Sequence, residues 1–538
     1  MNKKKLLSLL ILISLVWGFF YCQYQVPKVF AYGESLYSKI KIFTSILETI
    51  QRAYLEEKDT DELIEDAITG MLSNLDPHTT YLASDEFRTW NENFEGYSGI
   101  GIKYDIIRGQ VTVLTVLENG PAARLGILPG DRIVAIDGKP LSGVKLDEAA
   151  RRLKGHFGTL AELKIDRDSW PQPRAFRIRR ERIILNSIPQ ALMIKPEVGY
   201  VKIDRFTSTT SAELEKALNE LEHQGMKNLV LDLRDNAGGY LNAAVEVADK
   251  FIPGNKKIVY TKGRLPSSFQ EYYSTSEPTH PLYPLIVLID HGSASASEIV
   301  AGAIQDLDRG LVVGKSSFGK GLVQSQFRFQ DGSALLVTTA KYYTPSGRPI
   351  QREYYNKSKE EYYGEAYDDQ LRKTRSVQDH SHKYRTLSGR PVSSGNGIMP
   401  DVWVENRENI LSQNLRLLFY SDQRYFYTFV EDYIQRHPGV KKDMEGFIRH
   451  FELSNREYRA FFQLVKNTDP NLAQQDYTSD KEMIKFIIKR ELAYLIWGDS
   501  ARFRVNILRD KQLRVALKYF PNANRLLAVS TIQPLNKN

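Results

Sequence analysis

Strand and helix patterns alternate in residues 199–233, which read GYVKIDRFTSTTSAELEKALNELEHQGMKNLVLDL. The segments Gly199–Phe206 and Asn228–Leu233 have the short apolar patterns of strands, whereas Ser211–His223 has the spacing of an amphipathic helix. The same order continues with a second helix and an apolar strand that ends near Asp290. This alternation predicts an α/β core with a largely parallel or mixed sheet.

The segments on either side of this core differ in character. Residues 32–95 repeat apolar side chains at three and four positions, which predicts a helical region, and residues 96–182 change to short alternating strands. The core is expected over 183–405, with 352–386 as a polar insertion or long surface excursion. Helical periodicity then returns over 406–538. We therefore expect a multidomain α+β chain with a helical N-terminal segment, a small β domain, an α/β core and a C-terminal helical domain.

The composition is that of a globular protein and excludes several classes. The 538 residues suffice for about three or four domains of ~150 residues. The formal net charge is +8, but residues 1–31 hold four lysines and no acid, so a concentrated basic stripe for nucleic acid is not expected. The single cysteine, Cys22, excludes an intramolecular disulfide and, in the rest of the chain, cysteine catalysis and cysteine-based zinc sites.

Residues 1–31 have the organisation of an export signal. Lys3–Lys5 precede an apolar run over Leu6–Tyr21, and Ala31 follows Val29 at the spacing that signal peptidase prefers. The run has sixteen residues, shorter than the ~20 that cross a bilayer comfortably. We expect a signal peptide, with a retained membrane anchor as the alternative, and in both cases a body located in the periplasm or cell envelope.

A glycine-rich string in the small β domain predicts a peptide-binding module. Residues 118–138 read ENGPAARLGILPGDRIVAIDG and resemble the PDZ domain. Upstream, Gly99, Ile100, Gly101 and Ile102 match the carboxylate-binding loop of that family. Glycines there let successive backbone N–H groups converge on an anionic peptide terminus, while the peptide adds as a strand at the sheet edge. The alternative is a small β domain with tight turns and no ligand.

Ser295 is a candidate nucleophile. It stands at the predicted start of a helix, with Glu298 three residues later, and this capping box by itself explains both residues structurally. A helix start also stabilises developing negative charge. His291 is expected to be a solvated turn residue, because no carboxylate is evidently placed to orient it. Lys320, in the glycine-flanked turn 318–321, is the alternative base, if burial lowers its pKa by roughly 3 units from ~10.4.

The glycines around this lysine also allow a rival interpretation. Residues 314–321, GKSSFGKG, nearly match a phosphate-binding P-loop, but Gly321 stands where a magnesium-binding Ser or Thr belongs. The residues that follow predict two strands instead of the helix that a P-loop needs. His380 and His382 lie in the polar excursion, and no HExxH motif is present. We therefore expect no nucleotide, no metal and no other cofactor.

Six motifs in order resemble those of the carboxy-terminal processing peptidases, which are tail-specific serine proteases with an inserted PDZ domain. The motifs are GYVKI (199–203), LDLRDNAGG (231–239), SASASEIVAG (293–302), FGKGLVQ (318–324), KYYTPSGR (341–348) and GIMPD (397–401). The resemblance covers roughly Lys39–Glu405. It implies that Ser295 is the nucleophile, that Lys320 is the general base and that Gln324 orients the lysine.

The resemblance further implies an oxyanion hole formed by backbone N–H groups near Gly238 or Gly239 and of Ala296. Two positions depart from the family pattern. Ala237 stands where the family usually has Pro, and Asp290 stands where it usually has Asn. Neither departure removes a catalytic group.

Taken together, the sequence predicts an exported serine endopeptidase that cleaves envelope proteins near their C-termini. Its partners would be protein or peptide substrates with free C-termini, and the PDZ domain would capture that end of the substrate. A regulatory partner or self-association is left open. The alternative function is a non-catalytic PDZ scaffold of the envelope, in which Ser295 merely caps its helix.

Overall fold

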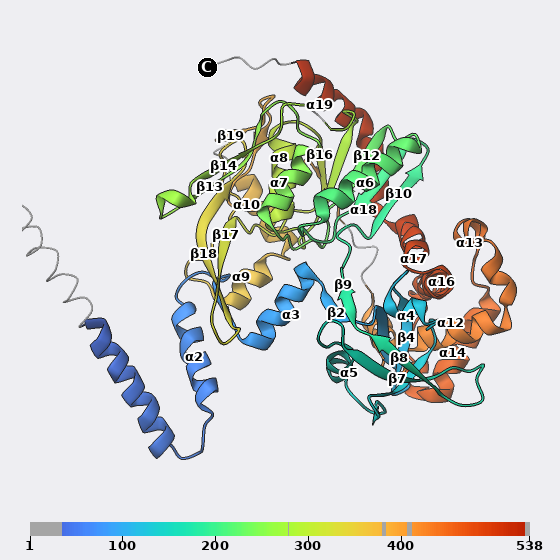
Figure 1. Cartoon of the computed structure of the whole chain (residues 1–538). Helices are drawn as coiled ribbons and strands as arrows, with labels where there is room; N and C mark the ends of the chain where they lie inside the picture. Colours follow the sequence, from blue (N-terminus) through green and yellow to red (C-terminus); the bar gives the residue numbers. More distant parts are fainter. Residues whose placement is uncertain (1–34, 278, 379–382, 406–410, 533–538) are drawn as a thin grey trace, which may run out of the picture. The chain divides into compact units, whose positions relative to one another are not determined.

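The computed structural model describes residues 35–277, 279–378, 383–405 and 411–532 (Figure 1). The export signal expected over 1–31 lies outside the described residues. The chain divides after Tyr81 into two compact units. The first unit contains a helix over 35–53 and helix α2 (Thr60–Leu72), and β1 (Thr80–Leu82) spans the boundary. The carboxylate of Asp59 begins α2 by accepting N–H groups of its first turn.

The α/β core of the second unit is built on a six-stranded sheet. Its strands, in spatial order, are β10 (Gln190–Lys195), β11 (Val198–Lys202), β12 (Asn228–Asp232), β15 (Leu285–Ile289), β16 (Leu311–Gly314) and β21 (Val402–Trp403). Only β10 pairs antiparallel to its neighbour, and the others run parallel. All five residues of β15 are buried, as expected for a sheet covered on both faces. The predicted mixed α/β core is confirmed.

Helices from two distant parts of the sequence cover the two faces of this sheet. One apolar cluster joins the sheet to α6 (Thr210–His223), α7 (Leu241–Asp249) and α8 (Ala296–Asp306). A second cluster joins its other face to α18 (Lys511–Ala516) and α19 (Phe520–Ile532). The last two helices of the chain are therefore part of the core.

A second, antiparallel sheet carries the long hairpin that follows Lys320. It contains β17 (Leu322–Arg328), β18 (Ala334–Tyr343), β13 (Lys257–Gly263) and β14 (Gln270–Tyr273). The segment after Lys320 is thus a strand, which excludes a P-loop at this position. Figure 1 shows this hairpin as the yellow strands β17 and β18.

The small β domain is a five-stranded antiparallel path with two short helices. The strands run in the order β3 (Ile102–Ile107), β4 (Gln110–Val116), β5 (Arg132–Ile136), β7 (Leu160–Asp166) and β8 (Arg174–Arg179), and β6 (Lys139–Pro140) pairs with β5. The helices are α4 (Pro121–Arg124) and α5 (Leu146–Leu153). The short strands β2 (Tyr97–Gly99) and β9 (Glu181–Ile183) pair where the chain enters and leaves the domain, after α3 (Ser84–Glu95). Strand β3 forms an edge of the sheet.

The C-terminal region is helical, as the sequence predicts. Its helices are α11 (Gln413–Phe419), α12 (Tyr425–Arg436), α13 (Met444–His450), α14 (Asn455–Thr468), α15 (Pro470–Ala473), α16 (Lys481–Trp497) and α17 (Asp499–Asn506). They share an apolar core of their own, in which the ring of Phe461 contacts those of Phe426 and Phe429. Among the helices that the structure describes, none combines the length and apolar character needed to span a bilayer.

The polar segment within 352–386 folds into helices α9 (Lys359–Glu365) and α10 (Asp369–Gln378), followed by the short strands β19 (Tyr384–Arg385) and β20 (Pro391–Val392). It was expected to be an insertion or surface excursion. Most of its residues between 353 and 375 are exposed or half-buried, but the side chains of Arg352, Tyr362 and Arg372 are each at most 2% exposed.

Candidate active site

Ser295 lies at the sharp turn between strand β15 and helix α8. Its backbone has φ 54° and ψ −111°, a conformation that L-residues rarely adopt and that costs about 1–3 kcal/mol. Such strain persists only where the surrounding contacts fix it. The side chain is half-buried at the start of a helix whose following residues are fully buried. The turn therefore presents a hydroxyl at the positive end of a helix.

The fully buried carboxylate of Glu298 connects Ser295 to residues 316–320, which we call the lysine loop. Its Oε2 accepts the backbone N–H groups of Ser295 at 2.8 Å and Lys320 at 2.9 Å. Its Oε1 accepts the N–H of Gly319 at 2.7 Å and the hydroxyl of Ser317 at 2.5 Å. Burial raises the pKa of Glu298, while these four donors favour its ionised form. Glu298 thus does more than cap its own helix, because two of its donors belong to the loop before Lys320 and a third to Lys320 itself.

Two further contacts arrange the lysine. The Nζ of Lys320 donates to Oε1 of Gln324 at 2.6 Å. The buried hydroxyl of Tyr342 lies 3.0 Å from the carbonyl oxygen of Ser295 and 2.7 Å from that of Lys320, so it can donate its proton to either. The structure therefore brings Lys320 and Gln324 into contact and ties the backbones of Ser295 and Lys320 through shared partners.

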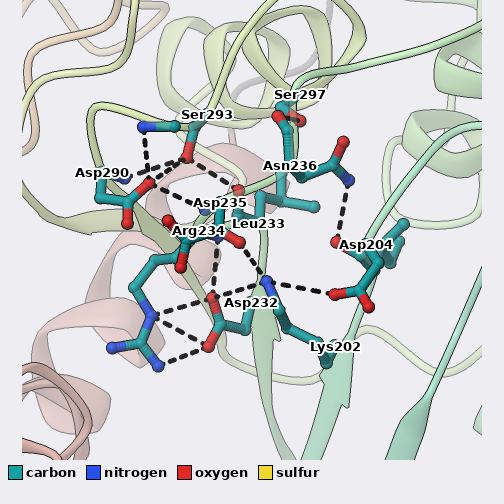
Figure 2. Close-up of polar contacts among 12 residues, drawn as sticks. Lys202, Asp204, Asp232, Leu233, Arg234, Asp235, Asn236, Asp290, Ser293 and Ser297 are labelled. Atoms are coloured by element: carbon teal, nitrogen blue, oxygen red, sulfur yellow. Dashed lines mark hydrogen bonds and ion pairs between the residues drawn. The ribbon is translucent and has the colours of Figure 1, made fainter. Parts of the chain in front are cut away.

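The loop after β12 approaches the serine turn through Asn236 and Gly238. Figure 2 shows Asn236 beside Ser297. The carbonyl oxygen of Asn236 accepts the N–H of Ala294 at 2.9 Å and the hydroxyl of Ser297 at 2.8 Å. Gly238 has φ +104°, and a Cβ built on it would lie 2.9 Å from the Cβ of Ser295. Only glycine fits there. The N–H of Gly238 donates to the side chain of Asn236 at 2.9 Å, within its own loop.

A buried ion-pair network supports the start of that loop, as Figure 2 shows for Lys202, Asp232 and Arg234. Asp232 accepts the Nε of Arg234 and the hydroxyl of Tyr200. Burial opposes ionisation, but the charges of Arg234 and Lys202 prevail and lower the pKa of Asp232 to about 2. Arg234 also pairs with Asp510, the N-cap residue of α18. The C-terminal part of the chain thereby contacts the base of the loop.

His291 is buried, so its expected role as a solvated turn residue is wrong. Its Nδ1 lies 3.1 Å from the carbonyl oxygen of Ser316, and its Nε2 lies 2.6 Å from Oδ1 of Asp369. Burial lowers the pKa of His291, although Asp369 acts in the opposite direction. A carboxylate therefore does orient this histidine. Since both ring nitrogens are engaged, His291 has none directed at Ser295 in this arrangement.

The predicted peptide-binding loop lines a small cavity of about 50 Å³ in the β domain. The cavity lies between this loop, strand β3 and helix α5, and its lining residues are Tyr97, Gly99, Ile100, Gly101, Ile102, Tyr104, Ala150, Leu153 and Lys154. Lys154 pairs with Glu92 and also lies over the ring of Tyr97. The four loop residues named from the sequence thus line one cavity together with Lys154.

The part of the chain that the structure describes contains no evident set of metal ligands. Within those residues no group of three or more His, Cys, Asp or Glu side chains is arranged to hold an ion. His380 and His382 lie outside the described residues.

Comparison with known families identifies three segments of the chain. Residues 197–356 match the model of peptidase family S41, and residues 112–167 match that of the PDZ domain. Residues 25–86 match the N-terminal domain of the activating protease CtpB.

Three relatives agree with these matches. The chain is 37% identical over 324 residues to the carboxy-terminal-processing protease of Bartonella bacilliformis, covering 59% of this chain and 74% of the relative. It is 38% identical over 302 residues to the carboxyl-terminal-processing protease of a Picosynechococcus species, covering 55% and 72%. It is 34% identical over 310 residues to the carboxy-terminal processing protease CtpB of Bacillus subtilis, covering 57% and 64%.

The core, the serine turn and the family matches define a serine peptidase of family S41 with a PDZ domain. Within that class, the chain belongs to the carboxy-terminal-processing proteases. The resemblance stated from its motifs is confirmed, and the chain is an enzyme.

Several residues of the site could not be named from the sequence. Tyr342 lies in the motif KYYTPSGR, but that motif suggested no role for it. Asp369, Arg352 and Arg372 come from the polar segment, which has no catalytic pattern. The spacing of Glu298 from Ser295 was visible in the sequence, but it predicted only that Glu298 caps the start of a helix.

Proposed function

We propose that this protease cleaves peptide bonds with a dyad of Ser295 and Lys320. The neutral amine of Lys320 takes the hydroxyl proton as Oγ of Ser295 bonds to the substrate carbonyl carbon. The resulting ammonium then gives that proton to the leaving nitrogen, and water releases the acyl group by the same route. The single observation that carries the proposal is the sharing of one Glu298 oxygen by the N–H groups of Ser295 and Lys320.

Gln324 is proposed to orient the base. Its Oε1 accepts from the Nζ of Lys320 at 2.6 Å, which limits the rotation of a long and flexible side chain. A fixed amine needs less reorganisation in the transition state than a free one.

The oxyanion would be held by backbone N–H groups of Ala296 and Gly239, with Gly238 as a further donor. Ala296 is the first residue of α8, where N–H groups are not used within the helix. The close approach of Gly238 to Ser295 supports a hole at this place. Because the N–H of Gly238 donates to Asn236, that bond must break before Gly238 can serve a substrate oxygen.

The PDZ domain is proposed to bind the substrate's C-terminal carboxylate at Gly99–Ile102. The loop lines the cavity, and β3, as an edge strand, offers backbone groups to an added peptide strand. The substrates would be envelope proteins, a location that rests on the export signal expected at the N-terminus.

Digestion of an unstructured protein tests the dyad. Wild type should degrade it, whereas Ser295→Ala and Lys320→Ala should not, although both should still bind a C-terminal peptide. Lys320→Arg is the matched control for charge, because arginine stays protonated and should also be inactive. Proteolysis by Lys320→Ala would refute the dyad. Binding without proteolysis in all four proteins would favour the scaffold instead.

Peptides that differ only at the terminus test the capture of the substrate. A peptide with a free C-terminus should bind and be cleaved better than its amidated form. Equal binding and cleavage of both forms would rule out carboxylate recognition at Gly99–Ile102.

A further inference from the structure

We propose that Arg352 and Arg372 are positioning residues for Lys320, and that the segment 352–378 holds the lysine loop in its catalytic arrangement. The inference rests on the proposed Ser295–Lys320 dyad and deepens it. It assigns a role in the reaction to a segment whose composition predicts only a surface excursion.

The two guanidinium groups bind the carbonyl oxygens just before the lysine. The Nε of Arg352 donates to the carbonyl oxygen of Phe318 at 2.5 Å, and Nη1 of Arg372 donates to the same oxygen at 3.2 Å. Nη2 of Arg372 also donates to the carbonyl oxygens of Ser317 and Asn396. The backbone N–H of Arg352 donates to the carbonyl oxygen of Gly319 at 3.0 Å. Three consecutive carbonyl groups before Lys320 are therefore held from this segment.

Glu298 binds the same loop from its N–H side. It accepts the N–H groups of Gly319 and Lys320, whereas the arginines donate to the carbonyl oxygens. The peptide planes on the approach to Lys320 are thus held by a carboxylate on their donor side and by two guanidinium groups on their acceptor side. This arrangement fixes the direction in which the lysine side chain leaves the backbone.

A second attachment joins the same segment to the serine loop. Asp369, the first residue of α10, accepts from Nε2 of His291 at 2.6 Å and from the Nζ of Lys315 at 2.6 Å. His291 lies in the loop that leads to Ser295, and Lys315 precedes the lysine loop. Helix α10 therefore contacts both loops that carry the proposed dyad.

Burial of these arginines is costly for a purely structural contact. Arg352 and Arg372 are 2% and 1% exposed, and Nη2 of Arg352 and Nε of Arg372 have no hydrogen-bond partner within the described part of the chain. Replacing buried charges by packed apolar side chains is often neutral or stabilising, so burial of two guanidinium groups is weak evidence for a stabilising role. Both arginines donate hydrogen bonds to carbonyl oxygens of the lysine loop, which an apolar side chain could not do.

Two positive charges bound to the loop that carries Lys320 would also favour its neutral amine. A nearby positive charge disfavours a second protonated group, and this effect is strong where water is excluded. Burial and the charge of Arg352 lower the pKa of Arg372 to about 10, which leaves it charged at neutral pH. The charged or titratable groups that act most strongly on the two arginines include Glu298, Tyr362, Glu365 and Arg375. Loss of one guanidinium should therefore raise the pH at which Lys320 becomes a base.

The test compares kcat and KM across pH for Arg372→Gln, Arg352→Gln and Arg372→Lys with a fluorogenic peptide substrate. The matched control is Lys373→Gln, which removes one positive charge from the next residue of α10, where the lysine pairs with Glu405. For Arg372→Gln we expect kcat to fall about 10- to 100-fold, with KM little changed. The acid limb of the pH profile of kcat, where Lys320 loses its proton, should move to higher pH. Arg372→Lys should keep the acid limb and recover part of kcat, and Lys373→Gln should match wild type.

Each outcome decides the proposal. Wild-type kcat and pH profile in both glutamine variants would overturn it, as would a fall in kcat with no movement of the acid limb. If Arg372→Gln lacks the cooperative urea unfolding of wild type and so is misfolded, Arg352→Gln and Arg372→Lys decide by the same criteria. Failure of the dyad itself is seen separately, as proteolysis by Lys320→Ala.

Discussion

The backbone N–H groups of Ser295 and Lys320 donate to one oxygen atom, Oε2 of Glu298, at 2.8 and 2.9 Å. The two residues are 25 positions apart in sequence and lie on different elements, a helix start and the approach to a hairpin. Because the carboxylate is fully buried, water cannot substitute for either bond. The relation between the two backbones therefore depends on the charge and shape of a single side chain.

Replacement of Glu298 by Gln tests this dependence. An amide presents an NH₂ group where one carboxylate oxygen accepts hydrogen bonds, so donors of the serine or lysine loop would face another donor. We expect kcat to fall about 100-fold and the free energy of unfolding to fall by about 2–4 kcal/mol. Peptide kinetics measure the first, and urea titration in the Ser295→Ala background measures the second without self-digestion.

Glu220→Gln is the control for this change. Glu220 is exposed on α6, so the same substitution there should leave both quantities unchanged. Wild-type kcat in Glu298→Gln would show that the shared oxygen is not required for catalysis.

Gly238→Ala tests the close approach of the second loop to the serine. A Cβ at this position would lie 2.8 Å from the carbonyl oxygen of Ala294 and 3.0 Å from the nitrogen of Ala296, and backbone atoms cannot move aside cheaply. We expect a loss of kcat of at least about 100-fold, because the loop must move away from Ser295 and its helix start. The measurement is kcat for a peptide substrate.

Gly225→Ala separates the steric effect from backbone strain. Gly225 also has a positive φ, +87°, but nothing lies within 4 Å of a Cβ built there. Both variants should lose about 1–2 kcal/mol of stability from the left-handed backbone, and only Gly238→Ala should lose activity. Full activity in Gly238→Ala would argue against an oxyanion hole at this loop.

The sequence was sufficient for those features whose signals are local. The alternation in residues 199–233 predicts β11, α6 and β12. The motif FGKGLVQ placed Lys320 and Gln324 close in sequence, and the two side chains are hydrogen-bonded. The capping-box spacing of Ser295 and Glu298 was also visible. The hydrogen bonds of Glu298 to the lysine loop could not be predicted, because a local motif does not indicate which other loop will contact the carboxylate.

The remaining features depend on contacts between distant segments. Asp369 meets His291 across 78 positions, and no periodicity records such a pairing. The polar composition around Arg372 indicates exposure, yet an arginine can bury its stem and satisfy its head on carbonyl oxygens. Similarly, α18 and α19 have the helical pattern of the preceding region, and only the structure shows that they cover the sheet.

Acid sensitivity of the core is expected to depend on Asp232. Its pKa is about 2 in the folded chain, against about 3.9 for a free aspartate. Because the folded value is the lower one, the stabilisation is fully present above pH ~4 and is lost as the pH falls toward 2. The difference between the two values corresponds to about 2–3 kcal/mol.

Between pH 5 and pH 2, wild type should therefore lose about that much more unfolding free energy than Asp232→Asn, measured by urea titration in the Ser295→Ala background. Asp235→Asn provides the contrast, since burial and the charge of Asp290 raise the pKa of Asp235. A raised value contributes stability at low pH that is lost as the pH rises, so this variant should gain stability relative to wild type at neutral pH. Equal acid sensitivity of wild type and Asp232→Asn would show that the buried network around Arg234 does not hold Asp232 in its ionised form.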